Sequence, residues 1–278
     1  MQRHLILPAQ GKLLISTDVH GNEEDIATLE AIFVALRAQE PQTHWVILGD
    51  VVHAPDEASR RENPDLYDYP DGSMQIVDRI LIQQRAHPGH VHFVLGNHDH
   101  GHVGGPHTAK FYPDEVAALE SRLRPDERQR LHTLFRSALF AVAAPCGVLL
   151  THGAPDDSLH DLRVLDETPL DILQMTGPQL RMMRTLLTSY GQSEPIVRAL
   201  LQSLSKTLRF PLSVVIHGHD RDDSGYFYEG NHQLCPCLFG APRQNKRYVL
   251  LDLSARYQSA QQIRVDQELR LLYPTART

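Results

Sequence analysis

The sequence predicts an α/β protein in which two β-sheets pack against each other and carry helices on their outer faces. Two observations lead to this prediction. Strand and helix patterns alternate in the first half of the chain, and the last third is rich in strand patterns. The chain has 278 residues, 41% of them hydrophobic, which is enough for one large core. Because no repeat, low-complexity tract or linker interrupts it, we expect a single domain over residues 1–278.

The first half of the chain alternates short apolar runs with longer amphipathic segments. Three apolar runs predict strands, at residues 12–17, 45–48 and 91–95. A helix is expected from Glu23 to Gln39, where apolar residues recur on one face. A second helix is expected up to Ala86 with Ser73 as its cap. The polar stretch 54–72 before it, rich in Pro, Asp and Arg, is expected to be a loop.

The second half begins with helices and ends with strands. Residues 113–137 predict two helices that separate before Pro125. Residues 156–208 predict a helical insertion, broken near Gly177-Pro178 and again at 191–195. Short apolar runs predict the remaining strands, at residues 139–143, 148–150, 213–216, 225–228, 234–239, 247–253 and 262–272.

Charge and composition exclude several classes of partner. The formal net charge is −7 and the pI is near 6.2, which argues against a duplex nucleic-acid partner. No apolar run approaches the ~18 residues of a membrane span, and no secretory signal opens the chain. The three cysteines, Cys146, Cys235 and Cys237, cannot all pair. We therefore expect a protein of the reducing cytoplasm that does not contact a membrane.

Five short runs of metal-binding residue types lie between residues 18 and 219, and each follows an apolar stretch that predicts a strand. The runs are Asp18-Val19-His20, Gly49-Asp50, Gly96-Asn97-His98-Asp99, Thr151-His152-Gly153 and His217-Gly218-His219. Because open α/β sheets bind ligands at the carboxyl ends of their strands, we expect the runs to meet. Asp, Asn and His supply oxygen and imidazole ligands for divalent metals. So many ligands suit two ions that share a carboxylate, about 3.5–4 Å apart.

The order of these runs resembles the calcineurin-like metallophosphoesterase superfamily, over residues 12 to 253. Within it, the likeness is greatest to the serine/threonine phosphoprotein phosphatase branch. The segments that carry this likeness are Asp18-Val19-His20-Gly21-Asn22, Thr151-His152-Gly153, Leu238-Phe239-Gly240-Ala241-Pro242 and Tyr248-Val249-Leu250-Leu251-Asp252. Many diesterases of the superfamily end in Gly-His-x-His. Here Gly218-His219 is followed by Asp220 and Arg221, which favours a monoesterase.

The resemblance implies a four-layer α/β/β/α sandwich of two mixed β-sheets flanked by helices. It also implies two divalent ions, and the mixed Asp, Asn and His ligands suit Mn, Fe or Zn. The first ion would take Asp18, His20 and Asp50. The second would take Asp50 as the bridge, with Asn97, His152 and His219. A hydroxide that bridges the two ions would attack phosphorus.

Three further residues of these runs each allow more than one role. The resemblance places His98 where it can protonate the leaving alkoxide, and the alternative is a histidine that hydrogen-bonds a ligand. Asp99 is a second catalytic candidate, which either orients His98 or a metal-bound histidine or is a plain loop residue. His217 lies two residues before His219, so it is either an additional metal ligand or buried beneath the site.

The sequence also departs from the phosphoprotein phosphatase branch. That branch carries an Asp-Arg pair shortly after its bridging Asp, and residues 51–55 contain neither residue. The carboxylate that orients His98 would then be Asp99, Asp56 or Asp68. The cation that binds phosphate would come from later loops, and the candidates are Arg60, Arg61, Arg221 and Arg243.

These observations favour a dinuclear metal-dependent phosphatase that hydrolyses phosphomonoesters, including phosphoserine or phosphothreonine in proteins. The expected partner is therefore a phosphorylated small molecule or a phosphoprotein. Three alternatives remain open. Hydrolysis of dinucleoside polyphosphates uses similar motifs, a phosphodiesterase would be favoured by His217 as a ligand, and a metal- or phosphate-binding scaffold would explain the missing Asp-Arg pair.

Overall fold

The computed structural model describes residues 1–274 and contains two mixed β-sheets. The five-stranded sheet has the order β11 (Leu269–Leu271), β10 (Arg247–Asp252), β2 (Lys12–Ser16), β3 (His44–Ile47) and β4 (Val91–Phe93). The six-stranded sheet has the order β1 (His4–Ile6), β5 (Ala141–Ala144), β6 (Val148–Thr151), β7 (Val214–Ile216), β9 (Gln233–Pro236) and β8 (Tyr226–Glu229). Each sheet combines parallel and antiparallel pairs, so the predicted mixed sheets are confirmed.

Alternation along the central strands builds one core between the sheets and another outside them. In β2, Leu13 and Ile15 belong to the inner cluster, while Leu14 faces the helices. In the parallel register of β2 with β3, Ile15 lies opposite Val46, which is also an inner residue. Because side chains of a strand point alternately to its two faces, a continuous apolar run is buried on both faces. The short apolar runs of the sequence are therefore the central strands.

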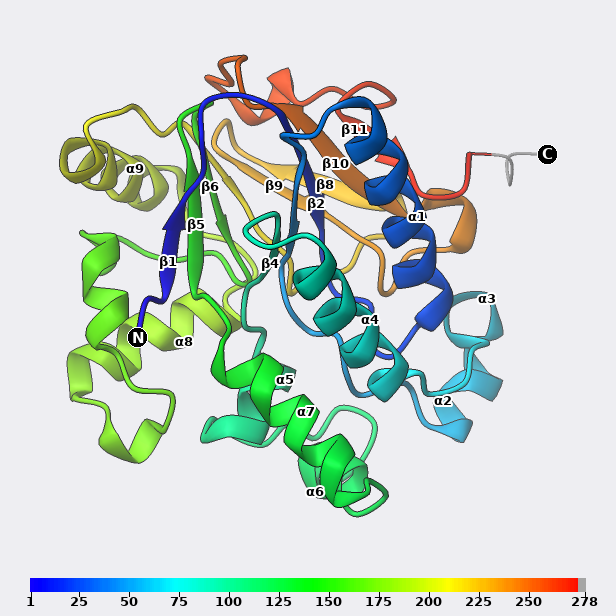
Figure 1. Cartoon of the computed structure of the whole chain (residues 1–278). Coiled ribbons are helices and arrows are strands. Elements are labelled where there is room, and N and C mark those ends of the chain that lie inside the picture. The colour runs from blue at the N-terminus through cyan, green and yellow to red at the C-terminus, as the bar shows by residue number, and fades with distance from the viewer. Residues whose placement is uncertain (275–278) are drawn as a thin grey trace.

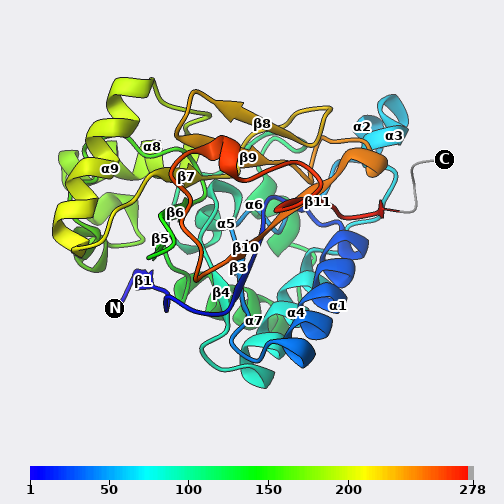
Figure 2. The ribbon, with the colours of Figure 1, turned by 90° about the horizontal axis from the view of Figure 1, so that it is seen from above.

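Helices cover the outer face of each sheet (Figures 1 and 2). α1 (Glu23–Gln39) and α4 (Ser73–Ala86) lie against the five-stranded sheet, and α8 (Gly177–Thr188) and α9 (Glu194–Leu208) lie on the far side of the six-stranded sheet. Phe33 of α1 packs against Trp45 of β3, with ring centroids 5.6 Å apart. This arrangement confirms the predicted four-layer α/β/β/α sandwich, while the single-domain organisation stays a prediction.

Several predicted elements are present with their expected bounds. α1 begins after Asn22, whose side chain accepts a hydrogen bond from the Asp25 N–H. The helices α6 (Glu115–Glu120) and α7 (Pro125–Arg136) separate before Pro125 as expected. In the insertion 156–208, the two α-helices follow two 3-10 segments, η2 (Leu162–Glu167) and η3 (Ile172–Gln174).

Other predicted elements are wrong. Stretch 54–72 is not a loop: it contains α2 (Glu57–Glu62), capped by the Asp56 side chain, and α3 (Pro64–Tyr67), which begins at a proline. Ser73 is the first residue of α4 and not its cap. Of stretch 262–272, only the three residues of β11 form a strand. The remaining short elements, which the sequence did not predict, are β1, α5 (Asn97–His100), η1 (Gly101–Val103), η4 (Arg243–Asn245) and η5 (Ala260–Gln262).

Within residues 1–274, none of the helices has the length and apolar character needed to cross a membrane.

Candidate metal centre and active site

All six predicted metal ligands follow the carboxyl ends of central strands. Asp18 and His20 follow β2, Asp50 follows β3, and Asn97 follows β4 in the five-stranded sheet. His152 and His219 follow β6 and β7 in the other sheet. Because β2, β3 and β4 are parallel to one another, as are β6 and β7, the loops of each set meet at one edge. The two sheets thus contribute ligands from opposite sides of one site.

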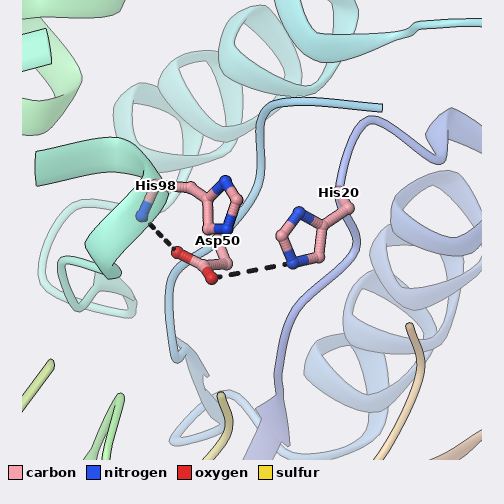
Figure 3. A group of neighbouring side chains, drawn as sticks. All are labelled: His20, Asp50 and His98. Carbon is pink, nitrogen blue, oxygen red and sulfur yellow. Dashed lines mark hydrogen bonds and ion pairs between the residues drawn. The ribbon is translucent and has the colours of Figure 1, made fainter. Parts of the chain in front are cut away.

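Asp50 lies at the centre of this site, between histidines of the two sheets. Its Oδ2 is 3.6 Å from Nε2 of His20 and 3.4 Å from Nε2 of His152. Its Oδ1 accepts a hydrogen bond from the backbone N–H of His98 at 2.9 Å, and Figure 3 shows Asp50 between His20 and His98. Two groups with metal-binding geometry share Asp50. One contains His20 and His98, and the other contains His152 and His219. A shared carboxylate of this kind suits two neighbouring ions.

The backbone of the site adopts conformations that cost energy. His20, Asp50 and His219 all have positive φ, at 40°, 50° and 67°. A left-handed conformation of a residue other than glycine costs roughly 1–3 kcal/mol and recurs at functional sites. Two glycines make room for the carboxylates. A Cβ on Gly96 would lie 2.2 Å from Asp50 Oδ1, and one on Gly218 would lie 2.3 Å from Asp18 Oδ2. The chain therefore bends sharply where the ligands leave the strands.

The donor set fits divalent metals. Nδ1 of His152 lies 2.6 Å from the Leu48 carbonyl, to which it donates its hydrogen. Nε2 of His152 then faces two oxygen acceptors, Asn97 Oδ1 at 3.0 Å and Asp50 Oδ2 at 3.4 Å. A proton or a metal ion must lie between these atoms, because bare lone pairs repel. Without a metal, the proton takes that place: burial opposes it, but Asp50 and Asp18 raise the pKa of His152 to about 10.

The two carboxylates of the site are buried without any Lys or Arg ion pair in the described part of the chain. Burial raises the pKa of Asp18 to about 6. Burial would also raise the pKa of Asp50, but the neighbouring His152 and His98 outweigh burial and hold that pKa well below its usual range. Two buried acids without a Lys or Arg partner favour a site for an added cation.

The structure gives Asp99 contacts with the backbone. Its carboxylate accepts hydrogen bonds from the N–H groups of Asp50 at 2.7 Å, Val51 at 3.1 Å and Gly96 at 3.0 Å. It therefore joins the loops that follow β3 and β4. The carboxylate beside the His98 ring is instead that of Glu115, whose Oε2 lies 3.2 Å from His98 Nδ1. Asp56, a further candidate for this contact, caps α2.

His217, the seventh candidate ligand, is fully buried. Its Nδ1 lies 3.0 Å from the Gly218 carbonyl, and its ring packs near Phe227 with centroids 6.1 Å apart. Its Nε2 has no hydrogen-bond partner. His217 belongs to none of the metal-binding groups found among residues 1–274, and it does not line the cavity described next.

A cavity of about 790 Å³ opens above the ligands. Tyr67 and Phe239 stack in its wall with centroids 5.2 Å apart, and Lys110 Nζ lies 4.3 Å from the centre of the Phe239 ring. Of the four predicted arginines, Arg221 lines this cavity. The cavity thus presents two cations, Lys110 and Arg221, next to the predicted metal ligands.

The other three predicted arginines lie elsewhere. Arg60 donates to the Tyr69 carbonyl at 3.3 Å, and the exposed Arg61 pairs with Glu57 one helical turn away. Arg243 makes a double ion pair with Glu24 and lies over the Tyr273 ring.

Sequence reasoning missed Lys110, Glu115 and His53. Lys110 lies in an irregular loop, where no pattern marks a cavity residue. Glu115 is in the first turn of α6, where an acidic residue is ordinary. His53 could have been suspected, because it lies in stretch 51–55, where the related branch carries its Asp-Arg pair.

Comparison with known proteins agrees with this geometry. Residues 11–222 match the calcineurin-like phosphoesterase family. The chain belongs to this family. It is accordingly a metal-dependent phosphoric ester hydrolase, and the family prediction is confirmed. A search of curated proteins finds no match.

Among solved structures, a cold-active protein-tyrosine phosphatase from a Shewanella species matches with a TM-score of 0.59 and 17% identity, over 91% of this chain and 78% of that one. A serine/threonine protein phosphatase from Saccharomyces cerevisiae matches with a TM-score of 0.56 and 12% identity, over 90% of this chain and 76% of that one. At these identities the likeness shows the shared fold.

Proposed function

We propose that this phosphoesterase hydrolyses phosphomonoesters with two divalent metals, Mn, Fe or Zn, held on either side of Asp50. The observation that carries the proposal is the position of Asp50 Oδ2, 3.6 Å from one imidazole and 3.4 Å from another. Asp18 and His20 would complete one metal site, and Asn97, His152 and His219 the other. When bound, the metals supply a water of lowered pKa and neutralise charge on phosphate oxygens.

The side chains around the metals supply the remaining steps. Lys110 and Arg221 line the cavity and would bind the phosphoryl oxygens that face away from the metals. His98 would donate a proton from Nε2 to the departing oxygen, since its Nδ1 faces Glu115. A leaving group that departs as the alcohol needs such an acid, because a free alkoxide is a poor leaving group.

A second, apolar pocket supports organic substrates larger than a simple alkyl phosphate. It has a volume of about 310 Å³, and Asn97 and Thr108 line both this pocket and the main cavity. One stripe of α8 forms its wall, with Leu180, Met183 and Leu187 spaced by three and four residues. An aromatic ring or an apolar peptide side chain attached to the phosphate fits a pocket of this size and composition. Phosphopeptides are therefore included among the proposed substrates.

We place this activity in the cytoplasm. All three cysteines are free and buried, and Sγ of Cys235 lies 3.9 Å from Sγ of Cys237 without a bond. Free thiols so close together suit a reducing compartment.

The test is a paired assay of the purified, manganese-loaded protein on p-nitrophenyl phosphate and bis-p-nitrophenyl phosphate, with a metal-stripped sample as the control. We expect metal-dependent turnover with a strong preference for the monoester. Preference for the diester would overturn the proposed substrate class in favour of a phosphodiesterase. If neither compound is hydrolysed while two metals are bound, diadenosine tetraphosphate is the next substrate to assay, and its hydrolysis would identify a dinucleoside polyphosphate hydrolase.

A further inference from the structure

A buried chain of histidines leads away from the active site behind His98. Nδ1 of His98 lies 3.0 Å from Nδ1 of His53, and Nε2 of His53 lies 2.9 Å from Nε2 of His102. Nδ1 of His102 then lies 2.8 Å from Oε1 of Glu120. The three imidazoles are all buried, and they come from the loop after β3 and from α5 and η1. No step of the proposed mechanism so far uses His53, His102 or Glu120.

Glu120, at the end of this histidine series, fixes the position of the hydrogen on His102. An ionised carboxylate only accepts hydrogen bonds, so His102 Nδ1 must carry the hydrogen that it donates to Glu120. His102, His132 and Arg128 all bind this carboxylate, and hydrogen bonds from His102, the largest cause, lower the pKa of Glu120 to about 2. Glu120 is therefore a fixed acceptor. A neutral His102 with hydrogen on Nδ1 presents a bare Nε2 to His53.

The same reasoning carries through His53 to His98. Two ring nitrogens 2.9 Å apart share one hydrogen, so His53 Nε2 donates to the bare Nε2 of His102. Burial lowers the pKa of His53 to about 3, and a neutral His53 then has a bare Nδ1. That atom lies 3.0 Å from His98 Nδ1, which must carry the hydrogen of this pair. The hydrogen-bonded series thus places the hydrogen of His98 on Nδ1 and leaves Nε2 facing the predicted metal ligands.

Two independent contacts agree with this assignment. Glu115 Oε2 is 3.2 Å from His98 Nδ1 but 3.9 Å from His53 Nδ1, so the acceptor lies nearer the nitrogen that carries hydrogen. Thr108 Oγ1 likewise lies nearer to His98 Nδ1, at 3.2 Å, than to His53 Nδ1, at 3.5 Å, and can accept from the His98 N–H. Both oxygens therefore lie nearer to the nitrogen to which the histidine series assigns the hydrogen.

We propose that His53, His102 and Glu120 are positioning residues, which together with Glu115 hold the His98 ring with hydrogen on Nδ1 and Nε2 toward the substrate. A carboxylate thus acts on His98 across two intervening imidazoles. The role in catalysis rests on the proposed phosphatase function, but the hydrogen placement on His98 does not.

The experiment compares three variants of the full-length protein. His53→Leu removes the middle of the chain, and Glu120→Gln replaces its fixed acceptor by an amide that can also donate. His132→Gln is the matched control, because His132 Nε2 binds the same Glu120 Oε1 at 2.9 Å but does not lie between Glu120 and His98. Metal content and thermal unfolding are measured for all three, to confirm that each variant folds and binds metal.

Two readouts separate positioning from a merely structural role. The first is kcat on β-glycerophosphate, which has a poor leaving group, relative to kcat on p-nitrophenyl phosphate, which has a good one. We expect this ratio to fall about tenfold or more in His53→Leu, a part of the 10²–10⁴-fold that a general acid contributes. A smaller fall is expected in Glu120→Gln, no change in His132→Gln, and unchanged KM throughout.

The second readout is independent of turnover. In zinc-loaded protein with ¹⁵N-labelled histidine rings, the wild type is expected to show His98 Nδ1 as the protonated nitrogen. This signal is expected to change in His53→Leu and Glu120→Gln but not in His132→Gln. Hydrogen on His98 Nε2 together with a bare Nδ1 in the wild type, or equal behaviour of Glu120→Gln and His132→Gln, would overturn the proposal. Absence of phosphatase activity with the expected ring signals would instead refute the proposed function alone.

Discussion

The metal-facing side of the active site and the side behind His98 are built in opposite ways. On the metal side, His152 Nε2 faces two oxygens and needs a proton or a metal ion between them, and His20 Nδ1 has no hydrogen-bond partner. Behind His98, rings and carboxylates pair in an unbroken series that ends at Glu120. The first side needs an added cation, whereas the series behind His98 is joined by hydrogen bonds between protein side chains alone. We infer from this difference that the first side binds the metals and the second side positions the His98 ring.

The largest effect is expected on the metal side. Asp50→Asn removes the charge that lies between the two metal groups and should weaken both ions together. We expect turnover to fall by more than about 10³-fold, because the metals supply both the nucleophile and charge neutralisation. Metal analysis by mass spectrometry should show fewer than two ions per chain. If Asp50→Asn keeps two tightly bound ions and normal turnover, the claim that Asp50 holds both metals on this side is refuted.

His98→Ala tests the boundary between the two sides. We expect metal content to be retained, and kcat on β-glycerophosphate to fall by about 10²-fold or more, as removal of a general acid predicts. Turnover of p-nitrophenyl phosphate should fall much less, because nitrophenolate leaves without a proton. Equal losses on both substrates would contradict an acid role, and loss of a metal would make His98 a ligand.

Substitution of Arg221 tests cation binding in the cavity, and the same substitution of Arg243 is the control. Arg221→Ala should lower kcat/KM for p-nitrophenyl phosphate by about ten- to a hundredfold, the loss of roughly 1.5–3 kcal/mol from a charged hydrogen bond. Arg243→Ala should have no effect, because Arg243 pairs with Glu24 and does not line the cavity. Steady-state kinetics decides between them, and equal losses in the two variants would refute the assignment of Arg221.

The smallest effect is expected in the apolar pocket, and it sharpens the substrate class. Leu180 is 41% exposed and lines the pocket, while Leu173 is 89% exposed and does not. Leu180→Asp should lower kcat/KM for 1-naphthyl phosphate a few-fold relative to phenyl phosphate, about 1 kcal/mol of lost apolar contact. Leu173→Asp should leave that ratio unchanged. A ratio that stays constant in Leu180→Asp would exclude the pocket from substrate binding.

Most of the fold could be predicted because its signals are local. An apolar run such as 12–17 is buried on both faces, and Asn22 caps the amphipathic helix that follows, so both elements are visible in a few residues. β1 escaped prediction because its three residues gain order only by pairing with β5, more than a hundred residues away. α2 and α3 escaped because Asp56 and Pro64 begin helices that bury few side chains.

The site residues likewise divide into those with a local sequence signal and those without one. The candidate metal ligands were visible because each lies within a few residues of a strand end, so the topology alone brings them together. Glu115 and Glu120 are ordinary residues of a short helix, and their roles arise only because the fold brings them to His98 and His102. Lys110 reaches the cavity through a loop without secondary structure. No pattern within a window of the sequence encodes such contacts.

The most direct test of the dinuclear site is a metal titration of the stripped protein, with p-nitrophenyl phosphate turnover and manganese content measured on the same samples. If Asp50 joins two ions into one centre, turnover should remain low with one ion per chain and saturate at two. Full turnover at one ion per chain, or turnover without metal, would contradict the account.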